Sequence, residues 1–127
     1  LILQNTSPLR NSKHIDEALT LLKKRNYDSV LSGFSYYTFL WKKQKDSTVI
    51  PLTYDPRKRP NHQKMYEQLY ENGALFATTY SAFKKSGCRI SGRIGFYKMP
   101  IELSYNIDTF DDLKDVKRIM KTLGKWL

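Results

Sequence analysis

Residues 1–34 read LILQNTSPLRNSKHIDEALTLLKKRNYDSVLSGF and contain the pattern that decides the fold. Leu1–Leu3 are a short apolar run that ends at a polar turn, and Ser29–Phe34 are a second run of strand type. Between them, apolar residues recur at the spacing of one helical face: Ile15, Ala18, Leu19 and Leu22. Ser12 is the expected N-cap of this helix. Strand, helix and strand in this order predict a βαβ unit, with the two strands paired in parallel through a right-handed crossover.

The first strand is expected to lie inside a sheet. A strand that is apolar at every position is typical of one buried between neighbours, with a helix over each face. We therefore expect Leu1–Leu3 to be an interior strand of a larger sheet. The chain does not begin with Met, which raises the question of what precedes this strand.

The stretch Ser35–Leu52 lacks a helical period and is rich in aromatic residues. Phe39–Trp41 and Thr48–Ile50 form two arms around the charged segment 42–46, which predicts a β-hairpin. Isolated hairpins are only marginally stable in water, so this one is expected to pack on a second subunit. An ordinary surface hairpin is the alternative.

The rest of the chain predicts two further strands and two helices. The strands are Gly73–Thr79 and Ile94–Met99, with a short helix over Tyr80–Lys85 between them. Thr109 is the expected N-cap of the last helix. The buried face of that helix is expected to consist of Leu113, Val116, Ile119, Met120 and Leu123.

Length and composition fit one soluble globular domain. The 127 residues are 40% hydrophobic and 27% charged, which is typical of such domains. No apolar run approaches the ~18 residues of a membrane span, and the start of the chain has no signal-peptide pattern. The single cysteine, Cys88, has no partner for an internal disulfide, which favours a reducing compartment such as the cytoplasm.

The charge balance indicates an anionic partner. Lys and Arg number 22 against 12 Asp and Glu, a formal charge of +10, which suits nucleic acid, a membrane surface or phosphate-bearing small molecules. Most of this charge is spread along the chain, as on ordinary solvated surfaces. Arg57–Arg59 is the exception, because local folding gives no reason for three cations in a loop between Pro56 and Pro60.

Several catalytic patterns are missing, and two candidate segments remain. The sequence has no glycine-rich phosphate loop, no G-x-S-x-G motif and no cysteine pair for zinc. Asn72–Gly73 is either a simple turn or the position of an amide that reads a sugar or base edge. Asp108 is either part of a helix cap or a ligand for Mg²⁺, which takes one or two carboxylates together with substrate phosphates. Cys88 is far along the chain from His14 and His62, so a Cys/His nucleophile pair is set aside.

Five motifs in order resemble one enzyme family. Leu3–Arg10 reads L-Q-N-T-S-P-L-R and resembles the L-Q-P-T-S-P-L-R signature of acylneuraminate cytidylyltransferases, also called CMP-sialic acid synthetases. The other four follow in the family's order: Tyr27–Val30 (Y-D-S-V), Pro56–Pro60 (P-R-K-R-P), Leu69–Gly73 (L-Y-E-N-G) and Ser104–Asp108 (S-Y-N-I-D). The resemblance runs from residue 1 to about residue 123 and is closest to the animal-type branch.

The resemblance implies a fold. Its class would be α/β, a three-layer Rossmann-like nucleotidyltransferase sheet, present in part, with a projecting dimerisation hairpin. Residues 1–127 would be the C-terminal portion of one cytidylyltransferase domain, with 35–63 as the hairpin and basic loop. In the family the signature strand follows a segment with an A-R-x-G-S-K-type loop that holds the triphosphate. This chain has no such loop, so it is expected to be inactive by itself.

The resemblance also implies a reaction and its participants. The complete enzyme would transfer CMP from CTP to a nine-carbon acidic sugar and release pyrophosphate, with Mg²⁺ as cofactor. It would be a homodimer whose subunits contribute to each other's sites, with no nucleic-acid or membrane partner. The implied substrate-binding residues are Gln4, Ser7, Arg10, Gln63 and Asn72. The implied metal ligands are Asp108 and Asn106, and the residues implied near the partner subunit are Arg57, Lys58 and Arg59.

The sequence departs from the family pattern at three polar positions. Asn106-Ile107-Asp108 stands where the family usually has D-I-D, so one metal carboxylate is an amide. Asn61-His62-Gln63 stands in place of R-R-Q, and Leu40 in place of a basic hairpin residue. These losses motivate an alternative, a non-catalytic or diverged homologue that acts as a sugar-nucleotide binding or regulatory dimer. A basic nucleic-acid-binding module is a third reading, but the sequence has no helix-turn-helix spacing or aromatic RNA-binding strand motif.

Overall fold

The computed structural model describes residues 1–61 and 67–124. The chain divides into two compact units, which we call the sheet unit (Leu1–Phe34 and Tyr70–Leu127) and the hairpin unit (Ser35–Leu69). In the described ranges no helix is long and apolar enough to cross a membrane.

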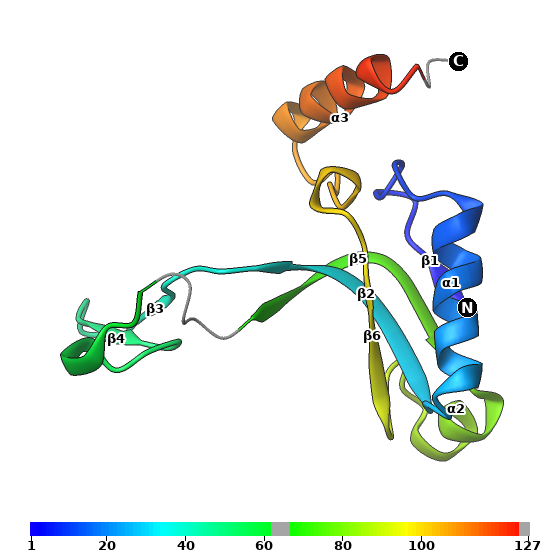
Figure 1. The fold of residues 1–127 in the computed structure, drawn as a ribbon, viewed down its shortest axis with the longest axis horizontal. Helices are drawn as coiled ribbons and strands as arrows, with labels where there is room; N and C mark the ends of the chain where they lie inside the picture. The colour runs from blue at the N-terminus through cyan, green and yellow to red at the C-terminus, as the bar shows by residue number, and fades with distance from the viewer. Residues whose placement is uncertain (62–66, 125–127) are drawn as a thin grey trace. The chain divides into compact units, whose positions relative to one another are not determined.

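A mixed four-stranded sheet forms the centre of the sheet unit (Figure 1). Its order is β1 (Ile2–Leu3), β5 (Gln68–Thr78), β2 (Ser29–Tyr36) and β6 (Ile94–Lys98). β1 pairs antiparallel with β5, and β2 pairs in parallel with β6. Ser29 contacts Thr78 and Ser32 contacts Leu75, so β2 and β5 also run antiparallel. This confirms the α/β class.

The predicted pairing of the first two strands is wrong. β1 and β2 point the same way, because each is antiparallel to β5, but β5 lies between them. A helical crossover sets the direction of the strand that follows it and leaves room for a third strand, so local sequence could not show the insertion.

β1 is an edge strand among the described residues, where it pairs only with β5. Leu1, Ile2 and Leu3 are 57, 46 and 40% exposed. The expected second neighbour, which would make this strand an interior one, is therefore not found within the described chain.

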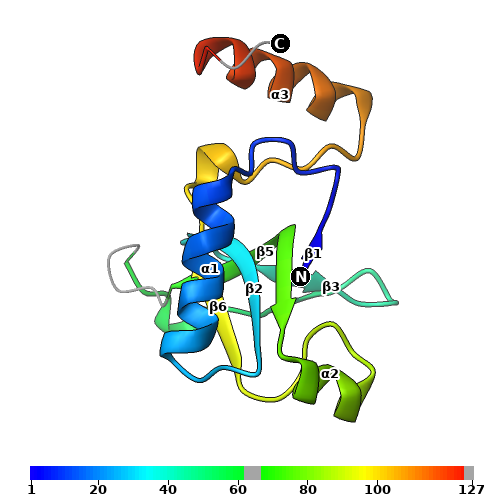
Figure 2. The same cartoon turned by 90° about the vertical axis from the view of Figure 1, so that its right-hand side faces the viewer.

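Helix α1 (Ser12–Lys24) packs along one face of the sheet (Figure 2). Its Ala18 and Leu22 join a core with Val30, Leu75 and Tyr97. Among the described helices, α1 is the one that lies along a face of the sheet. The expected arrangement of three layers is therefore seen only in part.

The N-cap of α1 is Asn11 and not the predicted Ser12. The Asn11 side chain accepts from the His14 amide at 3.2 Å, and His14 Nδ1 accepts from the Asn11 amide at 3.3 Å. Both Asn and Ser are good caps, and only the backbone turn shows which of two adjacent ones is used.

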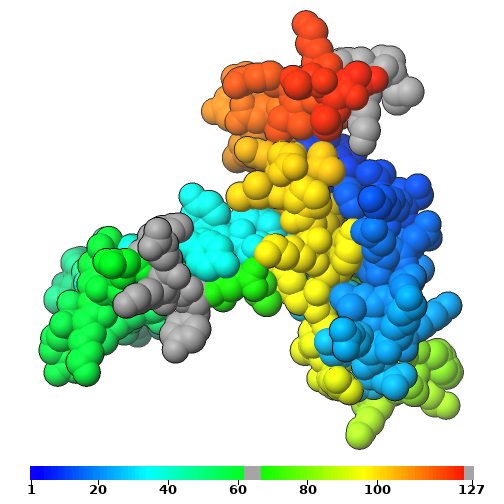
Figure 3. Space-filling view, viewed as in Figure 1, coloured from blue at the N-terminus to red at the C-terminus, as the bar shows by residue number. Residues whose placement is uncertain are grey.

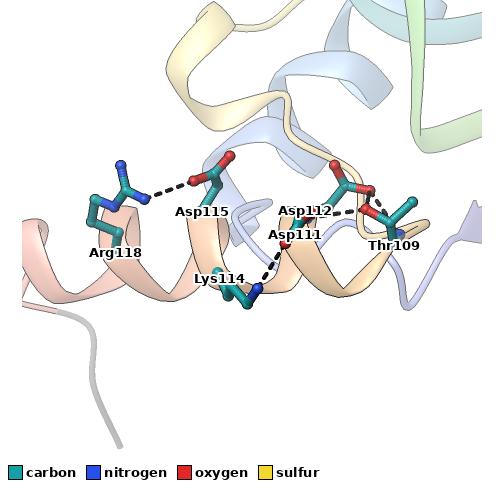
Figure 4. Close-up of polar contacts among 6 residues, drawn as sticks. All are labelled: Thr109, Asp111, Asp112, Lys114, Asp115 and Arg118. Carbon is teal, nitrogen blue, oxygen red and sulfur yellow. Dashed lines mark hydrogen bonds and ion pairs between the residues drawn. The ribbon is translucent and has the colours of Figure 1, made fainter.

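The remaining elements of the sheet unit follow the predicted order. α2 (Tyr80–Ser86) is capped by Thr79, and the 3-10 turn η3 (Ile101–Leu103) follows β6. α3 (Phe110–Thr122) has the predicted Thr109 cap, which forms a reciprocal capping box with Asp112 (Figure 4). Of the predicted buried face of α3, Val116 is buried, but Leu123 is 43% exposed, so the prediction is wrong at Leu123.

The hairpin unit contains the predicted hairpin. β3 (Trp41–Lys43) and β4 (Val49–Pro51) pair antiparallel, with Lys42 opposite Ile50. A 3-10 turn η1 (Pro56–Lys58) follows them. The Tyr54 ring makes edge contacts with the rings of Phe39 and Trp41, at centroid distances of 4.7 and 5.7 Å. The role of this hairpin in dimerisation stays a prediction.

Candidate substrate site at the carboxyl edge of the sheet

The carboxyl ends of β1, β2 and β6 meet at one edge of the sheet, because these strands share a direction. In α/β sheets, ligands bind in the crevice outside the carboxyl ends of the strands. The loop 4–10 follows β1, and the segment 101–108 follows β6. Figure 3 shows this segment (yellow to orange) directly beside the first residues of the chain (dark blue). We call the loop 4–10 the signature loop.

Arg10 holds the signature loop on the sheet. Its Nη1 donates to the carbonyl oxygen of Gln4 at 2.9 Å and to that of Ala74, in β5, at 2.5 Å. Partial burial lowers the pKa of Arg10 from its ordinary value, but a guanidinium remains a cation throughout the range in which proteins fold. Arg10 thus places a positive charge at this edge.

Gln4 lies against Gly73. The backbone of Gly73 has a φ of 68°, and a Cβ there would lie 2.3 Å from the Gln4 Oε1. Glycine adopts this left-handed conformation without steric cost, so Gly73 leaves room for the glutamine side chain within β5. Gln4 therefore lies beside the residue that follows Asn72, and a shared substrate site for the two stays a prediction.

The Asn72 side chain is buried, and each of its polar groups meets a protein partner. Its Oδ1 accepts from Ser32 Oγ at 2.7 Å and from the Ala74 amide at 3.0 Å. Its Nδ2 donates to Ser104 Oγ at 3.0 Å and contacts Met99 Sδ at 3.3 Å. The sequence predicts either a turn or a substrate ligand at Asn72, and neither prediction includes this buried network.

The two implied metal ligands lie next to the signature loop. Ser7 Oγ donates to Asn106 Oδ1 at 3.2 Å, and the Ile107 amide donates to the Thr6 carbonyl oxygen at 2.8 Å. The Asn106 Nδ2 donates to both carboxylate oxygens of Asp108, at 2.9 and 3.0 Å. Ser7 and Asn106 are 99 positions apart in the sequence. Their hydrogen bond therefore joins two distant segments of the chain into one surface.

The side chains of Asn106 and Asp108 are the predicted protein ligands of Mg²⁺. The Asp108 carboxylate is exposed, and carboxylate and amide oxygens are donors that Mg²⁺ accepts. The amide as placed turns its N–H groups, and not its oxygen, toward Asp108. Oxygen and nitrogen of an amide are assigned from the hydrogen-bond network. A cation would fit here with the amide turned over, so that Nδ2 faces the Ser7 hydroxyl.

The protein would supply only part of such a coordination shell. The described residues contain no group of three or more His, Cys, Asp or Glu side chains arranged to hold a metal. Asp112 lies close by, but its carboxylate is engaged by the Thr109 hydroxyl and amide and by the Asp108 amide. Most ligands of a cation at Asp108 would therefore come from water and substrate phosphates, as is usual for Mg²⁺.

Two shallow pockets adjoin this surface. One of about 310 Å³ is lined by Phe34, Ile101, Ser104, Tyr105 and Asn106. Another of about 250 Å³ is lined by Ile107, Asp108, Thr109, Phe110 and Leu113. The family motifs do not include most of the apolar residues that line these pockets, although Phe34 stands at the carboxyl end of a predicted strand. A larger pocket of about 410 Å³ includes Asp28 and Gly92, at the opposite end of the sheet.

The predicted basic residues lie in the hairpin unit. Arg57 Nε pairs with the Asp55 carboxylate at 3.1 Å, and hydrogen bonds from Arg57 lower the pKa of Asp55. The Arg59 guanidinium lies 4.0 Å from the centroid of the Phe39 ring, and Lys58 is exposed. Gln63, the remaining predicted substrate residue, lies outside the described residues.

Comparison with known proteins identifies relatives over most of the chain. No family model matches the sequence. N-acylneuraminate cytidylyltransferase A of Danio rerio is 34% identical over 109 residues, which cover 84% of this chain and 25% of the relative. The enzyme of the same name from Oncorhynchus mykiss is 32% identical over 109 residues, with the same coverage. The one from Streptococcus agalactiae serotype V is 30% identical over 114 residues, or 88% of this chain and 28% of the relative.

These matches agree with the family resemblance seen in the motifs. The chain spans about a quarter of the length of the relatives that it matches. Over more than four fifths of its length, the chain is about one third identical to fish and bacterial proteins that carry the same name. The chain belongs to the N-acylneuraminate cytidylyltransferase family.

Proposed function

We propose that this chain forms part of a nucleotidyltransferase that transfers CMP from CTP to a nine-carbon acidic sugar of the sialic acid type, with release of pyrophosphate. The observation that carries the proposal is the convergence of three family motifs at the carboxyl edge of the sheet. Hydrogen bonds made by Arg10, Ser7 and Asn72 join these motifs, which are the signature loop, the Asn72–Gly73 step and the segment 104–108.

The reaction needs positioning and charge neutralisation. The sugar hydroxyl attacks the α-phosphorus of CTP, a new P–O bond forms, and the bond to pyrophosphate breaks. Both substrates are anions, so the site has to hold negative groups close together. Arg10 contributes positive charge at this edge, and Gln4 offers an amide for the sugar. Bound Mg²⁺ would neutralise phosphate charge, with Asp108 and the turned-over amide of Asn106 as its protein ligands.

The test uses the complete gene product. It is incubated with CTP, Mg²⁺ and a panel of nine-carbon acidic sugars, and CMP-sugar and pyrophosphate are measured. We expect both products with at least one sugar and their loss on removal of Mg²⁺ by a chelator. Absence of product with every sugar would contradict the proposal. The 127-residue chain alone should release no pyrophosphate, because none of its motifs is a phosphate-binding loop.

One observation favours the non-catalytic alternative. Asn106 carries no charge, and its N–H groups already satisfy the Asp108 carboxylate. Asn106→Asp in the complete gene product separates the two readings. If the protein is an enzyme with weak metal affinity, this variant should need less Mg²⁺ for half-maximal turnover. Asn26→Asp, at an exposed turn on the opposite end of the sheet, is the matched control. No rise in metal-dependent turnover would favour a sugar-nucleotide binding or regulatory protein.

The proposal includes a homodimer. The hairpin exposes Trp41, Val49, Ile50 and Leu52 by 41 to 58%, and large apolar groups gathered on a surface commonly mark a protein interface. Arg57, Lys58 and Arg59 would then lie near the subunit contact. The cytoplasm is the proposed location, since a chain with one cysteine suits a reducing compartment.

A further inference from the structure

We propose that Asn72 is a positioning residue, which together with Ser32 and Ser104 holds the segment 104–108 in place at the edge of the sheet. We name these three side chains the Asn72 tether. The inference differs from the family resemblance, which implies that Asn72 holds the sugar acid.

The hydrogen-bonding capacity of Asn72 is used within the protein. A side-chain amide has two acceptor positions and two donor hydrogens. Here Oδ1 accepts from Ser32 Oγ and the Ala74 amide, and Nδ2 faces Ser104 Oγ and Met99 Sδ. The residue is 8% exposed. A substrate could bind this amide only by breaking one of these contacts, and leaving a buried polar group without its hydrogen-bond partner is unfavourable.

The tether joins three separate parts of the chain. Ser32 on β2 is fully buried, and its Oγ also accepts from the Leu75 amide at 2.9 Å. Asn72 lies on β5. Ser104 follows η3, and its Oγ donates to the carbonyl oxygen of Pro100 at 2.8 Å. A change at Asn72 therefore reaches the segment after β6 through two contacts, the 3.0 Å hydrogen bond to Ser104 Oγ and the 3.3 Å contact with Met99 Sδ.

The segment 104–108 is held at two points. Ser104 is fixed by the tether, and the Ile107 amide is fixed by the Thr6 carbonyl oxygen of the signature loop at 2.8 Å. Asn106 and Asp108 lie on either side of Ile107, so their position depends on both attachments. Their importance for substrate rests on the proposed function, whereas the tether itself does not.

Hydrogen exchange of the full 127-residue chain tests the tether without any substrate. Asn72→Asp removes the Nδ2 donor, and Ser104→Ala removes its acceptor while leaving Asn72 intact. We expect each variant to speed exchange of the Ile107 amide about tenfold. The amide of Thr79, which donates to Asp28 O at 2.8 Å at the other end of the sheet, should be unaffected. Ser81→Ala, on an exposed residue, is the control variant.

The double variant gives the decisive comparison. If Asn72 and Ser104 act through one hydrogen bond, exchange at Ile107 in the double variant should be no faster than in the faster single variant. The proposal is overturned if the accelerations of Ile107 exchange in the two single variants multiply in the double variant. It is also overturned if Ser104→Ala does not change the exchange rate. Equal acceleration at Ile107 and Thr79 would also overturn it, since the residues would then support overall stability alone.

The complete gene product adds a kinetic readout. A positioning role predicts that Asn72→Asp and Ser104→Ala both lower kcat and raise the Mg²⁺ concentration for half-maximal turnover, with little change in the KM of the sugar. A rise in the sugar KM in Asn72→Asp alone would show direct binding and overturn the proposal. A gene product without transfer activity would overturn the proposed function instead, and the exchange result would still decide the tether.

Discussion

Gly73 shows how one residue couples the strand β5 to the signature loop. Its φ of 68° is rare for residues with a side chain, and the Gln4 Oε1 fills the place that a Cβ would take. Gly87 has nearly the same φ, 67°, but no heavy atom within 4 Å of that place. Comparing the two glycines therefore distinguishes the cost of the left-handed backbone from the cost of crowding against Gln4.

Gly73→Ala should therefore destabilise the protein more than Gly87→Ala. We expect a loss of about 1 kcal/mol at Gly87 from the left-handed backbone alone. At Gly73 the loss should reach about 3 kcal/mol, because Gln4 must also move. Urea denaturation followed by circular dichroism measures both. Equal losses would mean that the Gln4 contact carries no energy.

Tyr97 links the stability of the sheet unit to alkaline pH. Its hydroxyl donates to the Glu17 carboxylate at 2.5 Å. Burial, followed by this neighbouring carboxylate, raises the pKa of Tyr97 above its ordinary value of 10.0. Folding thus favours the protonated phenol. The resulting stabilisation is fully present below pH 10 and is lost as the pH rises above that value.

The variant Tyr97→Phe checks this sign. At neutral pH it should lower the free energy of unfolding by about 1–2 kcal/mol, since a hydrogen bond to a charged group is lost. The difference from the wild type should shrink as the pH rises above 10. Tyr80→Phe, at a position that is 76% exposed, is the control and should show no such dependence. A difference that is constant with pH would contradict the assignment.

At the scale of elements, local patterns predicted the kinds and the order of helices and strands. The period of Ala18 and Leu22 and the Thr109 cap depend on contacts within one or two turns, and both were confirmed. Boundaries were less certain. β5 begins at Gln68 and not at Gly73, because the strand that lies beside β2 continues on both sides of the Asn-Gly step.

The cap of α1 gives a prediction at this scale. Asn11→Ala removes the capping box with His14 and should cost about 1 kcal/mol. Ser12 is the first helical residue, so Ser12→Ala should change the free energy of unfolding by only a few tenths. Thermal denaturation of both variants compares the two candidate caps directly. A larger loss at Ser12 would favour the cap that the sequence predicted.

At the scale of the whole molecule, the exposed hairpin predicts self-association. The wild-type chain should sediment as a dimer, since Trp41 and Ile50 remain 44 and 41% exposed. Ile50→Lys adds a charge to this surface and should shift the equilibrium toward monomer, because an unpaired charge is costly to bury. Gln44→Lys, in the turn of the same hairpin, is the control. A wild-type monomer at every concentration would contradict the prediction.

The sequence alone determined most of the elements and the family, and it predicted residues for the candidate site. Helical period, caps and turn residues act over a few positions, so they can be read without a fold. The motifs from Leu3–Arg10 to Ser104–Asp108 identified the family because their order and wording are visible in one dimension. They also named Gln4, Ser7, Arg10, Asn72, Asn106 and Asp108, which lie together at one edge of the sheet.

Only the tertiary structure decided how these parts meet. The insertion of β5 between β1 and β2 and the burial of Asn72 depend on pairings between residues far apart in the sequence, such as Ile2 with Phe76 and Asn72 with Ser104. Such pairings form wherever burying apolar surface and satisfying polar groups together give the lowest free energy. No local period encodes that choice. Asn72 could therefore be recognised in the sequence as important, while its hydrogen-bond partners became known only from the fold.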